Sequence, residues 1–219
     1  WRQFGDFEIL RTVADCEGFE GVKITQDPHP EHYSVDIFNI DDPVTANRCF
    51  LNFANALREA LRRLGYIVVP TESSLPHRSI VLGAHATVSL PENAIVYNAE
   101  QLTDATRIPI VVGDRRNHIV WDFSQQNMIE MIRVGFKRVV HCPLGYIDTM
   151  ETVQKVENED IDVLFYGWVN ERRAEILDKL EATGLRVVKL FGVYGRELDQ
   201  YIARSKVVLN LHFYEKASF

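Results

Sequence analysis

Apolar residues along the chain alternate between short runs typical of buried strands and longer stretches spaced as on one face of a helix. The run YSVDIFNI, residues 33–40, predicts a strand. The stretch after it carries apolar residues at helical spacing, namely Phe50, Phe53, Ala54, Leu57, Leu61 and Leu64, and Gly65 stands where a glycine commonly ends a helix. The strand-like runs YIVVP and SIVLGAH follow. A strand, a long helix and another strand form a βαβ unit, which implies a parallel sheet.

The alternation continues to about residue 150, stops in an acidic stretch and then restarts. Further strands are predicted in NAIVYNAEQL, in HIVWDF and in RVVHCPLGYI, and a helical pattern follows the second of these. The stretch DTMETVQKVENEDID is acidic and nearly free of large apolar residues, so we interpret it as a linker. Beyond it the runs DVLFYG, LRVVKLFG and KVVLNL predict three strands, and two helical patterns lie between them.

These patterns predict an α/β protein with two Rossmann-like parallel-sheet units, the second of them incomplete. We expect an N-terminal extension at 1–33, a first unit at 34–150, an acidic linker at 151–160 and a second unit at 161–219. Three strands and two helices are few for a doubly wound sheet. The last strand, KVVLNL, is apolar on both faces and therefore expects helices on both sides. We expect one face to lack its cover and to expose apolar residues, namely Val207, Leu209, Leu211 or Phe213.

Composition narrows the class of protein. The 219 residues are 46% hydrophobic and 25% charged, as in an ordinary globular protein, and the formal net charge of −7 argues against a general nucleic-acid binder. The 3 cysteines show no paired spacing and predict neither a disulfide framework nor a zinc site. His29 and His32 have no third ligand in view, which favours a solvated loop over a metal site. The unpaired cysteines favour a reducing cytoplasm, and no apolar run approaches a membrane span. Nothing in the sequence resembles a cage of Asp, Glu and His residues, so we expect no metal, and we expect no other cofactor.

Ligands of open parallel sheets bind outside the carboxyl ends of the strands, so the residues that follow each strand are the candidates. Gly167, Asn170, Arg172 and Arg173 follow DVLFY. Asn170 is a suitable helix N-cap, and arginines are disfavoured in a first helical turn unless an anion lies beside them. An anion held by the helix N-terminus and the arginines would remove this conflict, as a phosphate does. The alternative is that both arginines are solvated surface residues.

The other strand ends of the second unit carry further candidates. After RVVKL come two glycines around an apolar and an aromatic residue. This pattern suits either a backbone contact to a nucleobase or an ordinary turn. We select Tyr194 and Gly195 as candidate donor-binding residues. After KVVLNL come His212 and Glu215. Because all three loops leave the same edge of one sheet, we interpret them together as a binding site.

The strand ends of the first unit offer a second group of polar residues. His85, Asn98, Glu100 and Asp122 follow predicted strands there and are candidates for the acceptor side of a site. Each could equally be a helix cap or a satisfied core residue, and Asp122 in particular is typical of a helix start.

Several common motifs are missing from the chain. No GxGxxG follows the first strand, and the phosphate-binding GxxxxGK[ST] loop is absent. No GxSxG nucleophile turn is present either. The sequence therefore does not indicate a dinucleotide enzyme, a P-loop NTPase or an α/β-hydrolase.

Two stretches in the second unit resemble bacterial glycosyltransferases of the GT-B fold. They are YGWVNERRAEIL, which fits a YG-x-x-N-x-R-R-x-x-IL pattern, and LNLHFYE. HCPLGYID resembles the segment that closes the first domain of such enzymes, and the resemblance extends over residues 34–219.

The resemblance implies a nucleotide sugar bound against the second unit and an unknown acceptor, a glycan, a lipid-linked group or a protein, bound against the first. Such enzymes usually need no metal, because cationic side chains and a helix N-terminus stabilise the departing diphosphate. Arg172 and Arg173 match that loop in position, and Glu215 lies just ahead of the region where donor-binding acids occur. The catalytic residues are not indicated.

The resemblance also implies a second unit that continues for about a hundred residues. We therefore expect the chain to be cut short and inactive alone, with its C-terminal face covered by another chain, a second copy or further residues. Two other interpretations stay open. One is a glycosyltransferase-like module that binds a partner or a sugar nucleotide without turnover, and the other is a different doubly wound protein, such as a sugar-nucleotide epimerase or a flavodoxin-like regulator.

Overall fold

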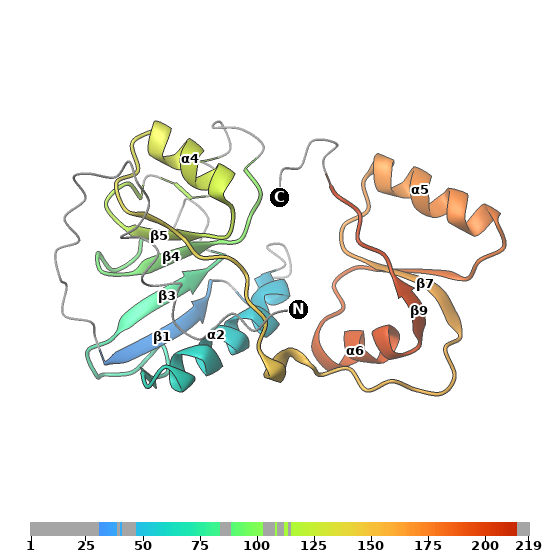
Figure 1. Ribbon diagram of the computed structural model, residues 1–219, viewed down its shortest axis with the longest axis horizontal. Helices are drawn as coiled ribbons and strands as arrows, with labels where there is room; N and C mark the ends of the chain where they lie inside the picture. The colour runs from blue at the N-terminus through green and yellow to red at the C-terminus, as the bar shows by residue number, and fades with distance from the viewer. Residues whose placement is uncertain are drawn as a thin grey trace, which may run out of the picture.

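The computed structural model describes residues 31–38, 40, 47–83, 89–102, 108, 112–113 and 115–213. Within these ranges the chain forms two separate parallel sheets, one of six strands and one of three, joined by an extended segment (Figure 1). The expected α/β class with parallel sheets is confirmed. The division into domains at residues 34–150, 151–160 and 161–219 stays a prediction.

The first sheet has the strand order β2-β1-β3-β4-β5-β6, and every neighbouring pair is parallel. Its strands are β1 (His32–Ile37), β2 (Ile67–Val68), β3 (Arg78–Leu82), β4 (Ile95–Asn98), β5 (Ile119–Asp122) and β6 (Val139–His141). Each of them overlaps a run that the apolar pattern marks as a strand, although β1 and β3 begin one residue before their runs.

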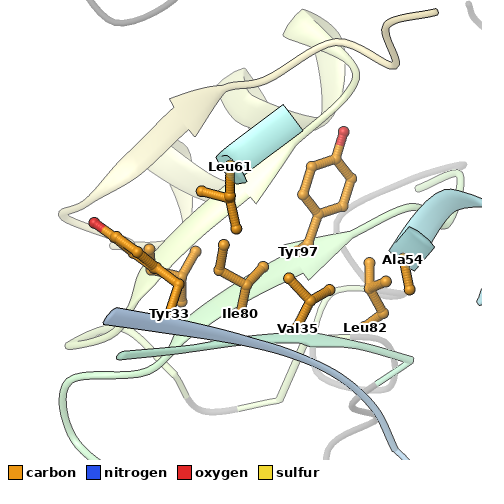
Figure 2. Close-up of a cluster of buried hydrophobic side chains, with 8 residues drawn as sticks. Tyr33, Val35, Ala54, Leu61, Ile80, Leu82 and Tyr97 are labelled. Atoms are coloured by element: carbon orange, nitrogen blue, oxygen red, sulfur yellow. The ribbon is translucent and has the colours of Figure 1, made fainter. Parts of the chain in front are cut away.

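Two helices cover opposite faces of this sheet. They are α2 (Leu51–Arg63), which the 3-10 helix η1 (Asn47–Phe50) precedes, and α4 (Gln125–Arg133). Leu61 and Ala54 of α2 pack with Ile95 and Tyr97 of β4 (Figure 2). Met131 of α4 packs with Val96 of the same strand, whose side chain points the other way. Gly65 ends α2 with a φ of 86°, a backbone conformation that glycine adopts without strain.

The second sheet has the order β8-β7-β9 and is again parallel. It consists of β7 (Ile161–Tyr166), β8 (Val187–Leu190) and β9 (Ser205–Val208), with helices α5 (Glu171–Ala182) and α6 (Gly195–Ala203) on its two sides (Figure 1). The central strand β7 is buried from Val163 to Phe165, and α5 contributes the fully buried Leu177. The core of this unit is therefore small and centred on one strand.

Strand β9 is an edge strand, and its apolar side chains are largely uncovered. Val207 is 52% exposed and Val208 is 41% exposed. Leu209, Leu211 and Phe213 are half-buried. The expected exposure of apolar residues at this strand is thus confirmed for Val207. Among the described residues, no strand pairs with the outer edge of β9.

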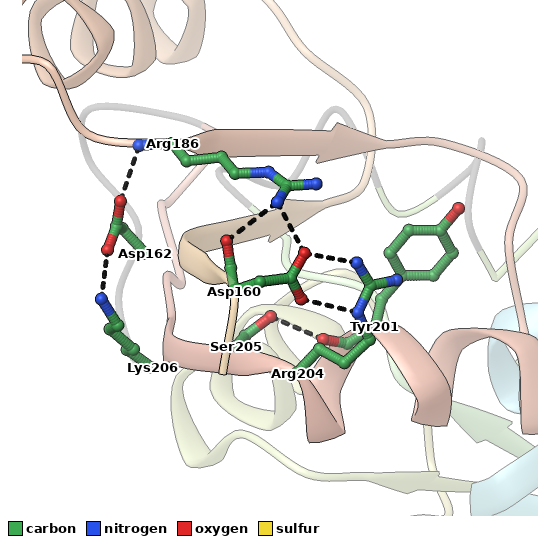
Figure 3. Close-up of polar contacts among 7 residues, drawn as sticks. All are labelled: Asp160, Asp162, Arg186, Tyr201, Arg204, Ser205 and Lys206. Atoms are coloured by element: carbon green, nitrogen blue, oxygen red, sulfur yellow. Dashed lines mark hydrogen bonds and ion pairs between the residues drawn. The ribbon is translucent and has the colours of Figure 1, made fainter. Parts of the chain in front are cut away.

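A cluster of ion pairs joins the starts of the three strands of the second sheet (Figure 3). Asp160, just before β7, accepts hydrogen bonds from Arg204 at 2.7 and 2.6 Å and from Nη1 of Arg186 at 2.5 Å. Asp162 accepts from Nζ of Lys206 at 2.6 Å and from the backbone N–H of Arg186 at 2.8 Å. The hydrogen bond from Arg204 is the main reason why the pKa of Asp160 is lowered to about 2. This cluster fixes the end of the sheet that lies opposite the candidate loops.

The segment between the two sheets is anchored at its start. The 3-10 helix η3 (Asp148–Met150) lies against α2, where Arg63 donates to Asp148 at 2.5 Å. Residues 151–158 are all exposed. Among the described residues, no helix has the length and apolar character that crossing a membrane requires.

Candidate functional site

The order of strands in the second sheet reverses direction at β7. In the order β8-β7-β9 the chain leaves β7 toward β8 first and returns to the other side of β7 as β9. Ligands of doubly wound sheets bind at such a reversal, outside the carboxyl ends of the two strands that flank it. Here those ends lead into residues 167–170 after β7 and residues 209–213 after β9. Four of the eight donor-side candidates, Gly167, Asn170, Arg172 and Arg173, lie on the first of these segments or in the helix turn after it.

Asn170 starts α5 and joins the two segments. Its Oδ1 accepts a hydrogen bond from the backbone N–H of Arg173 at 3.0 Å, which confirms the expected N-cap. Its Nδ2 donates to the carbonyl of Phe213 at 2.8 Å. Gly167, with a φ of 132°, lets the chain turn from β7 into this loop.

Both arginines also bind the segment after β9. Nη1 of Arg172 donates to the carbonyl of His212 at 2.7 Å. Arg173 donates to the carbonyl of Leu211 through Nε at 3.1 Å and Nη2 at 2.5 Å, and to the carbonyl of Trp168 through Nη1 at 2.6 Å. The side chains of three residues in and before the first turn of α5 therefore hold three consecutive carbonyls, those of residues 211–213. Neither arginine is a simple solvated side chain.

The two arginines differ in the surroundings of their guanidinium groups and in the number of hydrogen bonds that these groups already make. Arg173 lies between two aromatic rings, 5.3 Å from the centre of Phe165 and 5.1 Å from that of Phe213. Burial first, and the charge of Arg172 second, lower the pKa of Arg173. Arg172 is half-buried. Among the described residues it donates one hydrogen bond, from Nη1, although a guanidinium group carries five N–H donors. Arg172 is thus the better placed of the two to bind an added anion.

An aromatic pair joins the loops after β7 and β8. The rings of Trp168 and Phe191 meet edge to face, with centroids 5.2 Å apart and planes at 88°. Trp168 is 61% exposed and Phe191 is 55% exposed. All three loops of the second sheet therefore meet at one edge, as expected. Trp168 and Phe191 were not among the residues selected from the sequence, although both stand directly after a strand.

Tyr194 and Gly195 lie at the start of α6. Tyr194 is the residue before this helix, and Gly195 begins it with a φ of 59°. Burial raises the pKa of Tyr194, Cys49 raises it further, and Arg48 lowers it. His212 lies in the segment that Arg172 binds, and Glu215 lies outside the described residues.

The polar candidates of the first unit form a buried network at the carboxyl ends of β4 and β5. Asp122 accepts hydrogen bonds from Nδ2 of Asn98 at 2.6 Å and from the backbone N–H of Ser124 at 2.8 Å. Nδ2 of Asn127 donates to the two oxygens of Asp122 at 3.1 and 3.3 Å and to the carbonyl of Glu100 at 3.0 Å. The network therefore joins the loop after β4 to the start of α4.

Asp122 is fully buried within this network and has no surface to offer a ligand. Burial raises the pKa of its carboxyl to about 6, against the hydrogen bonds from its three donors, which lower it. Ser124, not Asp122, caps α4 by accepting from the backbone N–H of Asn127 at 3.4 Å, whereas Asp122 ends β5 and accepts from the backbone N–H of Ser124. Asn98 is buried as well, whereas Glu100 is half-buried. His85 lies outside the described residues.

No group of three side chains suited to a metal occurs within the ranges that the structure describes.

Comparison with known proteins gives three relatives from Acanthamoeba polyphaga mimivirus. The chain is 30% identical over 125 residues to uncharacterized protein L140, a match that covers 55% of this chain and 40% of L140. It is 28% identical over 134 residues to uncharacterized protein L137, covering 56% of this chain and 17% of L137. A shorter match to uncharacterized protein L138 is 38% identical over 56 residues, which is 25% of this chain and 6% of L138.

The chain thus spans less than half the length of the curated relatives it matches. No protein-family profile matches the chain, and no solved structure does.

Proposed function

We propose that the protein is a glycosyltransferase of the GT-B type that uses a nucleotide sugar as donor and needs no metal. One observation carries the proposal: three loops and a helix N-terminus with two arginines meet at the strand-order reversal of the second sheet. That arrangement supports binding of a ligand that carries a phosphate.

In this proposal the diphosphate of the donor lies against the N-terminus of α5 and accepts hydrogen bonds from the guanidinium group of Arg172 in the first turn of that helix. The N-terminus of a helix carries a partial positive charge, and guanidinium groups form strong hydrogen bonds with phosphate oxygens. The bond from the anomeric carbon to the diphosphate breaks, the bond to the acceptor oxygen forms and the proton of the acceptor hydroxyl passes to water, while negative charge grows on the diphosphate. A fixed cation and helix N-terminus stabilise that charge without a metal. Arg173 acts as a positioning residue that keeps residues 211–213 in place.

The acceptor lies on the side of the first unit in this proposal. Asn98 and Asp122 are the last residues of β4 and β5, and Glu100 follows β4, but only Glu100 of the three is partly exposed. We therefore assign contact with the acceptor to Glu100. We assign to Asn98 and Asp122 the role of holding the loop that carries Glu100, since their side chains bind one another and that loop.

A second candidate function is a module that binds a sugar nucleotide or a protein partner without turnover. The uncovered Val207 and Val208 of β9 favour it, because an apolar strand edge is suited to pairing with another chain. Incubating the protein with nucleotide sugars in EDTA distinguishes the two. Release of sugar or its transfer by this chain supports the enzyme and excludes the module.

The diphosphate site is tested by calorimetry with UDP, GDP, ADP and CDP. Arg172→Ala is expected to weaken binding of the preferred diphosphate by about 1.5–3 kcal/mol for each charged hydrogen bond lost. Lys179→Ala is the matched control, because Lys179 is an exposed cation in the last turn of the same helix. Equal affinities of the wild type and the folded Arg172 variant would remove Arg172 from the site. If none of the four diphosphates binds the wild type, the proposal itself is wrong.

A further inference from the structure

Trp168 and Phe191 form an exposed aromatic platform that the packing of the second unit does not require. Each ring leaves more than half of its surface uncovered, and each contacts the other across two loops. Large aromatic side chains usually bury most of their area, so a pair held in the open indicates a surface that binds something.

The platform continues the edge that carries the arginines. The carbonyl of Trp168 accepts from Nη1 of Arg173, whose Nε and Nη2 bind Leu211 after β9. Along the strand order β8-β7-β9 the edge therefore carries aromatic rings first and guanidinium groups next. A ligand that lies along this edge would present a planar or apolar ring at one end and an anion at the other.

We infer that the platform of Trp168 and Phe191 stacks the nucleobase of the donor. The inference rests on the proposed function and deepens it, because it names the two side chains that bind the base of the donor. Bases stack on aromatic side chains whatever their sequence, and the neighbouring cations bind the phosphates. A neutral glycan would also stack on aromatic rings, but it gives the arginines beside the platform no partner.

The test compares UDP with inorganic pyrophosphate, which lacks the base and ribose, by calorimetry on the same protein. The wild type is expected to bind UDP at least about 10-fold more tightly than pyrophosphate. In the Trp168→Ala/Phe191→Ala double variant this ratio is expected to fall to near 1, while the affinity for pyrophosphate stays unchanged. Trp168→Phe, which keeps a ring, is expected to keep most of the ratio. Tyr146→Ala is the matched control, since Tyr146 is 69% exposed but lies in the segment before η3.

Each outcome separates this inference from the proposed function. If the wild type binds pyrophosphate and UDP equally, or if the double variant keeps the full ratio, the stacking inference is overturned and the diphosphate site stands. If pyrophosphate, UDP, GDP, ADP and CDP all fail to bind, the proposed function fails together with the inference, and if GDP, ADP or CDP binds more tightly than UDP, that diphosphate replaces UDP in the comparison. If the double variant keeps the ratio but loses binding to a neutral oligosaccharide, the platform belongs to a glycan and the inference is wrong.

Fluorescence gives a second and independent measurement. The chain has 3 tryptophans, so a Trp1→Phe/Trp121→Phe variant leaves Trp168 as the reporter. UDP is expected to quench its emission with the affinity found by calorimetry, whereas pyrophosphate is expected to leave it unchanged. Equal quenching by both probes would show that the ring does not distinguish the base, and would contradict the inference.

Discussion

Gly83 shows how strictly a single position near a strand end can be constrained. It follows β3 with a φ of 68°, and a Cβ placed on it would lie 2.8 Å from Cγ of Asn47. Asn47 is buried and donates to the carbonyls of Phe38 at 2.5 Å and of Gly83 itself at 3.4 Å. The amide of Asn47 therefore joins the ends of β1 and β3, and it leaves no room for a side chain at residue 83.

Three alanine substitutions separate backbone strain from crowding. Gly83→Ala is expected to lower the free energy of unfolding by about 2–4 kcal/mol, because it combines a left-handed φ with an overlap. Gly65→Ala has the strained φ of 86° but open space, so we expect a loss of about 1 kcal/mol. Gly145→Ala has neither and should change the free energy of unfolding little. Urea denaturation measures all three, and equal midpoints for Gly83→Ala and Gly65→Ala would exclude the overlap.

At the scale of elements, the strands and helices could be predicted from the sequence, whereas their contacts could not. Apolar runs and helical spacing are local signals, and Asn170 and Ser124 are N-caps that follow from residue type alone. The bonds from Arg172 and Arg173 to the carbonyls of His212 and Leu211 depend on where β9 lies relative to β7, which no local pattern indicates. Trp168 and Phe191 are 23 residues apart in sequence and meet for the same reason.

The ion pairs before β7, β8 and β9 predict how these strands respond to acid. The pKa of Asp160 is lowered to about 2 in the folded protein, mainly by Arg204, from a usual value of 3.8. A carboxyl with a lowered pKa contributes stability above its unfolded pKa and loses it as the pH falls toward the folded value. The contribution of Asp160 should therefore be complete at pH 5 and disappear as the pH falls from about 4 to 2.

Denaturation of the wild type and Asp160→Asn across this range tests the assignment. The variant is expected to be less stable at pH 7, and the difference is expected to shrink toward zero at pH 2. Glu157→Gln, in the exposed segment between the sheets, is the control that should show no such difference. A difference between wild type and Asp160→Asn that is independent of pH would mean that the packing of the side chain, not its charge, matters.

At the scale of the whole molecule, the two sheets have separate cores. Leu61 belongs to the cluster around α2 and β1, and Leu177 is fully buried in the second unit. Because residues 151–158 between the sheets are exposed, little packing couples the two cores through this segment. We therefore predict two transitions in calorimetric unfolding.

Leucine-to-alanine variants assign the transitions. Leu177→Ala and Leu61→Ala should each destabilise their own unit by about 2–5 kcal/mol and leave the other transition in place. A single transition that both variants shift equally would contradict the division of the chain at residues 151–160.

The exposed run at 151–158 affects the binding of any ligand that contacts both sheets at once. It contains Lys155, a site for trypsin, and the run acts as a tether that sets the local concentration of one sheet near the other. A cut at Lys155 should leave a ligand bound by the second sheet alone with its affinity intact. Any activity that needs both sheets at once should instead become dependent on dilution, since the halves would then meet only by diffusion.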